Sequence, residues 1–256
     1  MNFRQYASRG WFVLLLGLAL LVWRGQATAT PQNIPDTITV NTAMLSPTEN
    51  GNPNDNKCDL REALQAAFNA ANTGQPATFN ECTAGSGTVF IVFDGAAAGQ
   101  SITMPAGGTV LPFIKGNVTL TGPITLAGSG YVLNAGDNSD SRLLRVASGG
   151  TLNLAGVNID QGFTSGGGGA ILGDNNSTIN AVGVSFTDNT AYGDGGAINS
   201  AGTVNILASN FSANRAYGQH PAGGTNPNTG YGGAIYIPGA GSPNLAPSNL
   251  SGNTAA

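Results

Sequence analysis

Short apolar runs alternate with glycine, asparagine and serine from about residue 100 onward. Within the runs, Val, Ile and Leu alternate with Thr and Asn, which is the period-two pattern of strands that bury one face. Four runs align at spacings of 27, 25 and 39 residues, and the last spacing is longer because a Gly/Pro/Asn-rich loop is inserted at 218–230. The aligned runs are Thr151–Ile159, Thr178–Phe186, Thr203–Phe211 and a degraded copy, Ser242–Leu250.

Two further motifs recur along the chain together with these runs. The tetrapeptide Gly-Gly-Ala-Ile occurs three times, and a tag that ends in asparagine follows each copy. An internal repeat of this length indicates that each copy is one structural unit, which buries its apolar face against its neighbours. The copies are Gly168–Ile171 with Phe186–Asn189, Gly195–Ile198 with Phe211–Asn214, and Gly232–Ile235 with Leu250–Asn253.

One copy holds three short strands, around 197–198, 204–207 and 210–211. Each strand can form one side of a coil that pairs in parallel with the next coil at a step of about 4.8 Å. The sequence therefore predicts an all-β fold, a right-handed parallel β-helix with three strands per coil. A sandwich or barrel of antiparallel strands is the alternative, and it predicts hairpin turns of about two to five residues instead of long matching copies.

The coil arrangement gives each repeated residue a place. We expect the glycine pairs to form corners, where positive φ is needed, and the tag asparagines to form an amide ladder. We expect Ile198, Val204, Ile206 and Phe211 to point inward and stack on Ile171, Ile179, Ala181 and Phe186. The predicted corners are Gly168, Gly169, Gly195, Gly196, Gly232 and Gly233, and the predicted ladder is Asn189, Asn214 and Asn253.

The first hundred residues differ from the repeats. Residues 60–72 carry apolar side chains at helical spacing, with Asp59 as N-cap, Glu62 as its capping-box partner and Gly74 as C-cap. Short strands are predicted at 38–40 and 88–93, and residues 46–57 are Asn- and Pro-rich loop.

Residues 1–29 have the layout of a signal peptide. Arg4 and Arg9 precede an apolar run from Trp11 to Trp23, and Ala27-Thr28-Ala29 fits a cleavage site. An uncleaved anchor is the alternative, although the run is shorter than the ~20 residues of a membrane helix. Removal of this segment would leave six basic and 13 acidic residues, a formal net charge of −7. That balance argues against nucleic acid or an anionic membrane as partner, because both favour basic surfaces.

The chain has two cysteines, Cys58 and Cys82, in the part that would be exported. An oxidising compartment favours one disulfide between them. The alternative is a zinc site, but two Cys and one distant His do not complete a tetrahedral shell.

The segment Cys58–Leu64 (Cys-Asp-Leu-Arg-Glu-Ala-Leu) resembles the signature of the CSLREA domain, the N-terminal module of many exported bacterial β-helix proteins, with departures at Asp59 and Leu64. The Gly-Gly-Ala-Ile copies and Phe-x-x-Asn tags resemble the repeats of chlamydial polymorphic outer-membrane proteins, which are surface autotransporter passengers with adhesin-type roles. Together the resemblance covers residues 36–256. It implies a cap at 30–99, whose helix covers the first coil, and β-helix repeats at 100–256. We expect either that the chain is a fragment of a longer protein or that its last coil is exposed.

A glycosidase of this fold would need clustered carboxylates. The candidates are Asp160, Asp174, Asp188 and Asp194, and none recurs at its aligned place in the next copy. Turn chemistry explains such positions equally well. Arg215 and His220 are the basic residues beyond Arg145, and His220 lies in the insertion. We therefore expect no catalytic residue, no cofactor and no metal, with a polysaccharide lyase or hydrolase as the alternative.

Three tyrosines, Tyr192, Tyr217 and Tyr231, each precede a glycine near a coil boundary. Aromatic rings along one edge can hold a sugar or a partner protein, although packing over corner glycines explains them equally well.

The expected function is that of an exported, adhesin-like or passenger protein of the cell surface or outer membrane. Its expected partner is a surface glycan or a protein of a host or neighbouring cell. We expect membrane attachment only through the signal segment or a C-terminal anchor outside this chain. A non-functional remnant of a longer protein is a third alternative.

Overall fold

The computed structural model describes residues 36–45, 55–104, 111–128, 142–218, 230–239 and 241–256. All of them belong to one compact unit, Ile34–Ala256. The signal-like segment 1–29 and His220 lie outside the described residues. The cap and repeat boundaries predicted at 30–99 and 100–256 remain predictions.

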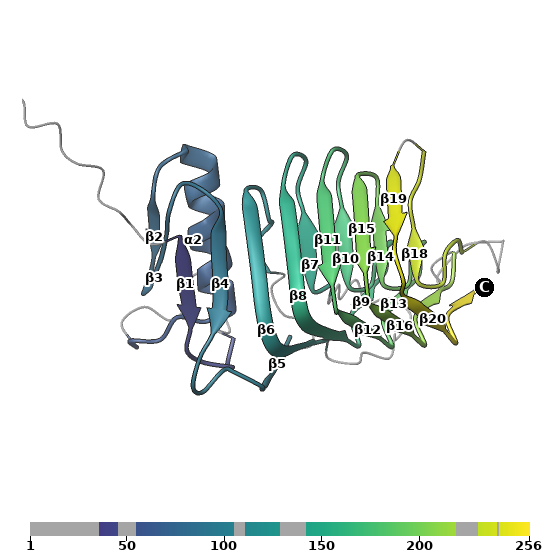
Figure 1. The fold of residues 1–256 in the computed structure, drawn as a ribbon, viewed down its shortest axis with the longest axis horizontal. Helices are drawn as coiled ribbons and strands as arrows, with labels where there is room; N and C mark the ends of the chain where they lie inside the picture. The colour runs from purple at the N-terminus through teal and green to yellow at the C-terminus, as the bar shows by residue number, and fades with distance from the viewer. Residues whose placement is uncertain (1–35, 46–54, 105–110, 129–141, 219–229, 240) are drawn as a thin grey trace, which may run out of the picture. The chain divides into compact units, whose positions relative to one another are not determined.

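The described residues form mostly parallel β-sheet with a single α-helix (Figure 1). The helix is α2 (Leu60–Thr73), where the sequence predicts a helix over 60–72. The strands before the repeats are β1 (Thr37–Val40), β2 (Ala77–Phe79), β3 (Cys82–Ala84), β4 (Val89–Phe93), β5 (Ser101–Thr103) and β6 (Asn117–Ala127). The repeats hold β7 (Leu144–Val146), β8 (Thr151–Asp160), β9 (Phe163–Thr164), β10 (Ile171–Gly173), β11 (Thr178–Val182), β12 (Ser185–Thr187), β13 (Thr190–Ala191), β14 (Ile198–Ser200), β15 (Thr203–Leu207), β16 (Asn210–Ser212), β17 (Arg215–Ala216), β18 (Ile235–Tyr236), β19 (Ser242–Leu245), β20 (Asn249–Ser251) and β21 (Thr254–Ala255).

Helix α2 begins and ends at specific caps. The Asp59 carboxylate accepts from the backbone N–H of Glu62 at 2.9 Å, and the backbone N–H of Asp59 donates to the Glu62 carboxylate at 3.2 Å. Gly74 adopts a left-handed conformation and returns its N–H to the carbonyl of Ala70. These contacts satisfy backbone groups that have no partner inside the helix.

The predicted disulfide is present. Cys58 and Cys82 are bonded, with their Cα atoms 5.4 Å apart. The bond ties the residue before the helix cap to the start of β3. Closing a loop of 24 residues' separation in the unfolded chain is worth about 3 kcal/mol of stability.

Three sheets run side by side through the repeats. The main sheet follows the order β1-β4-β6-β8-β11-β15-β19, with β12, β16 and β20 continuing it past a bend. The second sheet is β7-β10-β14-β18 and the third is β9-β13-β17-β21. Every pairing within these three sheets is parallel, and the antiparallel pair among the described strands is β2 with β3. Repeated parallel pairing contradicts the alternative of an antiparallel sandwich or barrel.

Each full repeat contributes four strands, one more than expected from the sequence. The copy that starts at Ile198 supplies β14 to the second sheet, β15 and β16 to the main sheet and β17 to the third. The fourth strand is only two residues long. A two-residue strand carries no alternation of its own, so its sequence pattern cannot be recognised.

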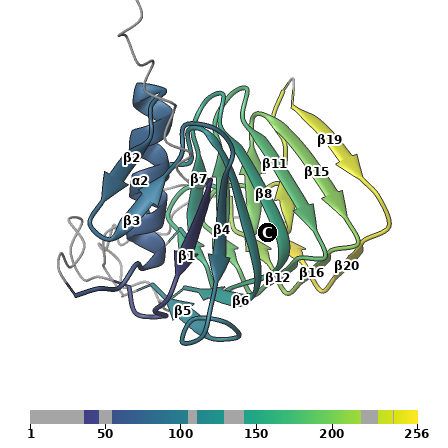
Figure 2. The same cartoon turned by 60° about the vertical axis from the view of Figure 1, so that its left-hand side comes forward.

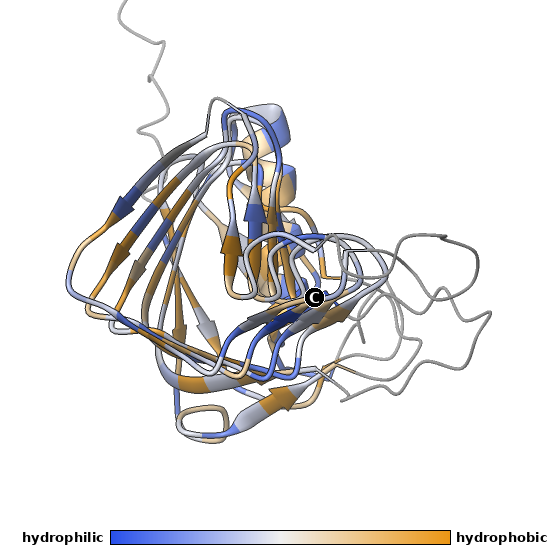
Figure 3. Ribbon diagram, turned by 90° about the vertical axis from the view of Figure 1, so that its right-hand side faces the viewer, coloured by the Kyte–Doolittle hydropathy of each residue, from blue (hydrophilic) through white to orange (hydrophobic). Residues whose placement is uncertain are grey.

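The core lies between the sheets, and the expected partners meet there. Ile171 pairs with Ile198, Ile179 with Val204 and Ala181 with Ile206, all buried. The rings of Phe186 and Phe211 stack with centroids 4.5 Å apart. Hydrophobic and hydrophilic residues alternate along the strands in the end-on view (Figure 3). One face of each strand is therefore reserved for stacking on the adjacent repeat.

Candidate functional site

The glycine pairs lie where the second sheet begins in each repeat, and their two members differ. The first member (Gly168, Gly195, Gly232) has positive φ between 62° and 70°. The second member does not, but a Cβ there would collide with the adjacent chain. At Gly196 it would lie 2.2 Å from the carbonyl oxygen of Gly233 and 2.4 Å from the backbone nitrogen of Arg215. The same close approach occurs at Gly169 and Gly233. A Cβ would collide at the first member as well, for example 2.1 Å from the Ile198 carbonyl oxygen at Gly195. Steric space thus explains both glycines of each pair, and conformation is a second reason for the first.

The tag asparagines Asn189, Asn214 and Asn253 form a hydrogen-bonded row, which we call the inner asparagine ladder. The Asn189 amide donates to Asn214 Oδ1 at 2.9 Å, and the Asn214 amide donates to Asn253 Oδ1 at 2.8 Å. The same oxygens accept the backbone N–H groups of Asn189 and Asn214, at 3.0 Å each. Each amide also donates to a main-chain carbonyl, for example that of Phe186 at 3.0 Å from Asn214. Asn189 and Asn214 are completely buried. The ladder therefore satisfies main-chain groups that have no access to water.

A second row of asparagines lies on the outward face of the main sheet, and the sequence analysis missed it. We call Asn153, Asn180 and Asn205 the outer asparagine row. The Asn180 amide donates to Asn153 Oδ1 and the Asn205 amide to Asn180 Oδ1, both at 2.7 Å. All three are only half-buried. The available signal is Thr-x-Asn at the start of each aligned run, at Thr151, Thr178 and Thr203.

The three tyrosines do not form one set. The Tyr192 ring stacks on Tyr217 with centroids 5.3 Å apart and meets Phe163 edge-on at 5.6 Å. Burial and the neighbouring Tyr217 hydroxyl raise the pKa of Tyr192. Tyr231 stacks instead on Tyr236 at 5.7 Å, and 61% of its surface is exposed. We call Phe163, Tyr192 and Tyr217 the aromatic column.

Two of the four candidate aspartates are electrostatically close. The pKa of Asp160 is raised, and burial is the largest cause. The charge of Asp188 raises this pKa further, whereas hydrogen bonds from Gln161 lower it. Asp174 is engaged elsewhere, in a two-pronged pair with Arg145 at 3.2 Å. Asp194 accepts the backbone N–H of Tyr231 at 2.8 Å. The structure therefore brings one carboxylate pair together and uses the other two to hold neighbouring segments.

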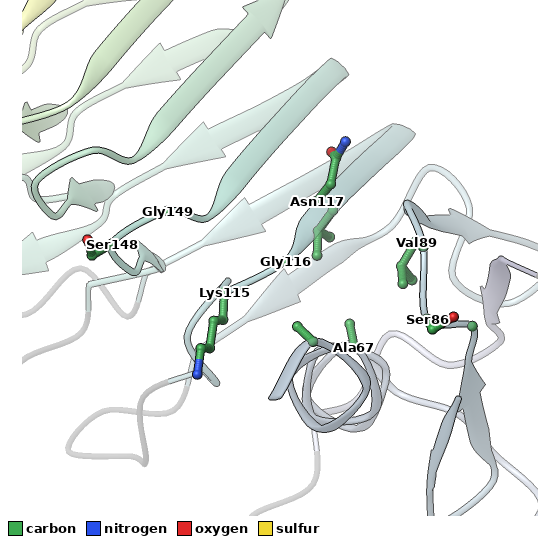
Figure 4. A pocket seen from close by; sticks show the side chains of 12 residues that line it. Ala67, Ser86, Val89, Lys115, Gly116, Asn117, Ser148 and Gly149 are labelled. Carbon is green, nitrogen blue, oxygen red and sulfur yellow. The ribbon is translucent and has the colours of Figure 1, made fainter. Parts of the chain in front are cut away.

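A hollow of about 280 Å³ lies between α2 and the start of β6 (Figure 4). Figure 2 shows α2 and β6 with this end of the molecule turned toward the viewer. Lys115, Ser86, Ser148 and Asn117 contribute polar groups, and Ala67 contributes an apolar wall. The ammonium of Lys115 is hydrogen-bonded to Asn72, and the Asn117 amide donates to Thr88 at 3.1 Å. Lys115 thus connects the helix to the residues just before β6, and Asn117 connects β6 to the residue before β4. A second hollow, of about 510 Å³, lies beside β18, β19 and β20.

Comparison with known proteins identifies one family in the repeats. The family model of the Chlamydia polymorphic membrane protein repeat matches residues 183–201. The matched residues include strands β12, β13 and β14, and so contain Phe186–Asn189 and Gly195–Ile198. It supports the repeat part of the resemblance, and it does not reach the CSLREA-like segment. No curated protein and no solved structure is significantly similar to the chain.

Among the described residues, no three His, Cys, Asp or Glu side chains are grouped as metal ligands would be. No helix in that part of the chain combines the length and the apolar character that crossing a membrane requires.

Proposed function

We propose that this chain is a right-handed parallel β-helix of the polymorphic-membrane-protein type, exported and displayed at the outer membrane or cell surface. The match of residues 183–201 to that repeat family carries the proposal. It is supported by the parallel pairing of successive repeats in three sheets. A disulfide between Cys58 and Cys82 agrees with an oxidising location.

The display role predicts that the chain binds a surface glycan or a protein of another cell and performs no chemistry. Tyr217, at the end of the aromatic column, is the side chain that supports binding. It is 38% exposed, whereas Phe163 in the same column is buried. Tyrosine edges of this kind combine apolar contact with a hydroxyl that can donate or accept a hydrogen bond.

Fractionation of Gram-negative cells that express the chain tests export, which display requires. We expect the full chain in the periplasm, the outer membrane or the medium, and a variant without residues 1–29 in the cytoplasm. Recovery of the full chain in the cytoplasm would contradict the proposal.

Adhesion is tested separately, with purified protein on cultured cells and glycan arrays. We expect Tyr217→Ala to lower binding, and Phe90→Ala, an exposed aromatic side chain on the main sheet, to leave it unchanged. Equal loss in both variants would indicate non-specific apolar adsorption.

A carbohydrate-active enzyme is the second candidate, because Asp160 has a raised pKa beside Asp188. Paired carboxylates whose pKa values are pushed apart can act as acid and base. Cleavage of any member of a panel of neutral and acidic polysaccharides, lost in both Asp160→Asn and Asp188→Asn, would favour this candidate over the display role.

A further inference from the structure

The outward face of the main sheet is a regular array of short side chains. Strands β6, β8, β11 and β15 pair in register, so that their outward residues fall into three columns along the stack. The strands lie side by side in Figure 1. The first column is Asn117, Thr151, Thr178 and Thr203, the second is Thr119, Asn153, Asn180 and Asn205, and the third is Thr121, Ala155, Val182 and Leu207.

The second column is held rigid by its own hydrogen bonds. The Asn153 amide donates to Asn117 Oδ1 at 2.8 Å and to the Thr119 hydroxyl at 3.2 Å, and the outer asparagine row continues these contacts at 2.7 Å. A primary amide has two donors and two acceptor lone pairs, so each asparagine in the row retains some of its capacity. These groups are fixed at the step of the sheet before any ligand arrives.

The array also differs from an ordinary protein surface in its charge. None of its twelve side chains is charged, whereas roughly a quarter to a third of a soluble surface is ordinarily charged. Its third column is partly apolar, and Val182 and Leu207 are each 46% exposed. An uncharged mixture of hydroxyl, amide and methyl groups has no net charge with which to attract a charged polymer.

The spacings of the array are close to those of crystalline water. Oxygens joined by hydrogen bonds of about 2.75 Å in a tetrahedral network have second neighbours about 4.5 Å apart and an axial repeat of about 7.3 Å. Parallel strands are spaced about 4.8 Å apart, and alternate residues along a strand about 6.6 Å. The mismatch accumulates to about 0.9 Å over three strand steps and to about 1.4 Å across the three columns. Both values are smaller than the distance of about 2.75 Å between hydrogen-bonded oxygens.

We propose that this face binds ice. The hydroxyl and amide columns order water at lattice positions, and the apolar column fills the space between rows without binding water of its own. The proposal is independent of surface display, because ice binding is measured on purified protein in solution. A crystalline polysaccharide is the other ordered solid that an uncharged array could fit.

The test measures thermal hysteresis and the partition of the full chain into slowly growing ice. We expect the protein to concentrate in the ice fraction and to shape ice crystals. Thr178→Lys, in the middle of the first column, should abolish both effects because a strongly hydrated ammonium interrupts the array. The matched control is Thr190→Lys, which makes the same change on the third sheet of the same repeat.

Circular dichroism and thermal unfolding establish that both variants fold. If Thr178→Lys does not fold, Thr203→Lys makes the same change in the next row. Exclusion of the wild-type protein from ice, or equal partition of the column variant and the control, would overturn the proposal. Adsorption to crystalline cellulose or chitin without partition into ice would also overturn it, and would assign the face to a polysaccharide.

Discussion

The inner asparagine ladder and the outer asparagine row use the same side chain at the same step of the sheets. Their amide-to-amide distances are nearly equal, 2.8–2.9 Å inside and 2.7 Å outside. They differ in what surrounds them. Inner amides also satisfy buried main-chain groups, whereas the members of the outer row exchange hydrogen bonds at a surface where water competes. A hydrogen bond of given geometry therefore stabilises the fold according to what its loss would leave unsatisfied.

The largest effect expected from this difference is that of Asn214→Ala. The change removes the acceptor of the Asn189 N–H and the donor to the Phe186 carbonyl, both buried. Two buried groups without partners cost about 3–5 kcal/mol of unfolding free energy. Urea unfolding followed by circular dichroism measures the loss. A loss below about 1 kcal/mol would mean that water replaces the amide, and that the inner ladder is no more important than the outer row.

A buried polar group without a partner provides the opposite test inside the repeats. Among the described residues, the Ser177 hydroxyl is buried and makes no hydrogen bond. Ser177→Ala removes that unsatisfied group at nearly constant volume and should stabilise the fold by about 1 kcal/mol. The same urea titration measures it. Destabilisation by Ser177→Ala would show that the hydroxyl has a partner, such as a bound water.

Asp160 extends the comparison to a half-buried position. Its raised pKa means that the folded state binds the proton more tightly than the unfolded state. Its contribution to stability is therefore fully present below the ordinary pKa of 3.8 and is lost as the pH rises through the folded value. We expect Asp160→Asn to raise the melting temperature at pH 7 and to change it little at pH 3. Asp188→Asn should lower the pKa of Asp160, which a carbon-detected NMR titration reads directly, and an unchanged pKa would mean that the two carboxylates do not interact.

The sequence predicted those features that depend on periodicity or on local chemistry. The helix follows from its spacing and caps, the pairing of Phe186 with Phe211 from the aligned runs, and the disulfide from the cysteine count. Contacts between residues that share no motif could not be predicted. Tyr192 and Tyr231 both precede a glycine, but Tyr231 stands directly before its Gly-Gly pair, where Asp194 stands in the preceding repeat, and its ring stacks on Tyr236.

The two asparagine rows also differ in how well the sequence alone predicts them. The motif Phe-x-x-Asn is specific because it contains an aromatic residue, whereas Thr-x-Asn is common in any chain that is rich in Asn and Thr. Only the register of β8, β11 and β15 reveals that Asn153, Asn180 and Asn205 are neighbours. Burial, which separates the two rows energetically, depends on all three sheets together and has no local signature.

The smallest effect is expected for Asn180→Ala. The change breaks two hydrogen bonds of 2.7 Å, as many amide-to-amide contacts as Asn214→Ala breaks inside. Water can reach the groups left behind, because the outer row is only half-buried. The unfolding free energy should therefore fall by no more than about 1 kcal/mol. Measuring both variants in the same urea titration compares the two rows at equal residue type and equal number of amide-to-amide contacts. Asn214 differs from Asn180 in its burial and in the main-chain carbonyl that its amide also satisfies. Equal losses in the two variants would mean that hydrogen-bond geometry, rather than access to water, determines the stability of both rows.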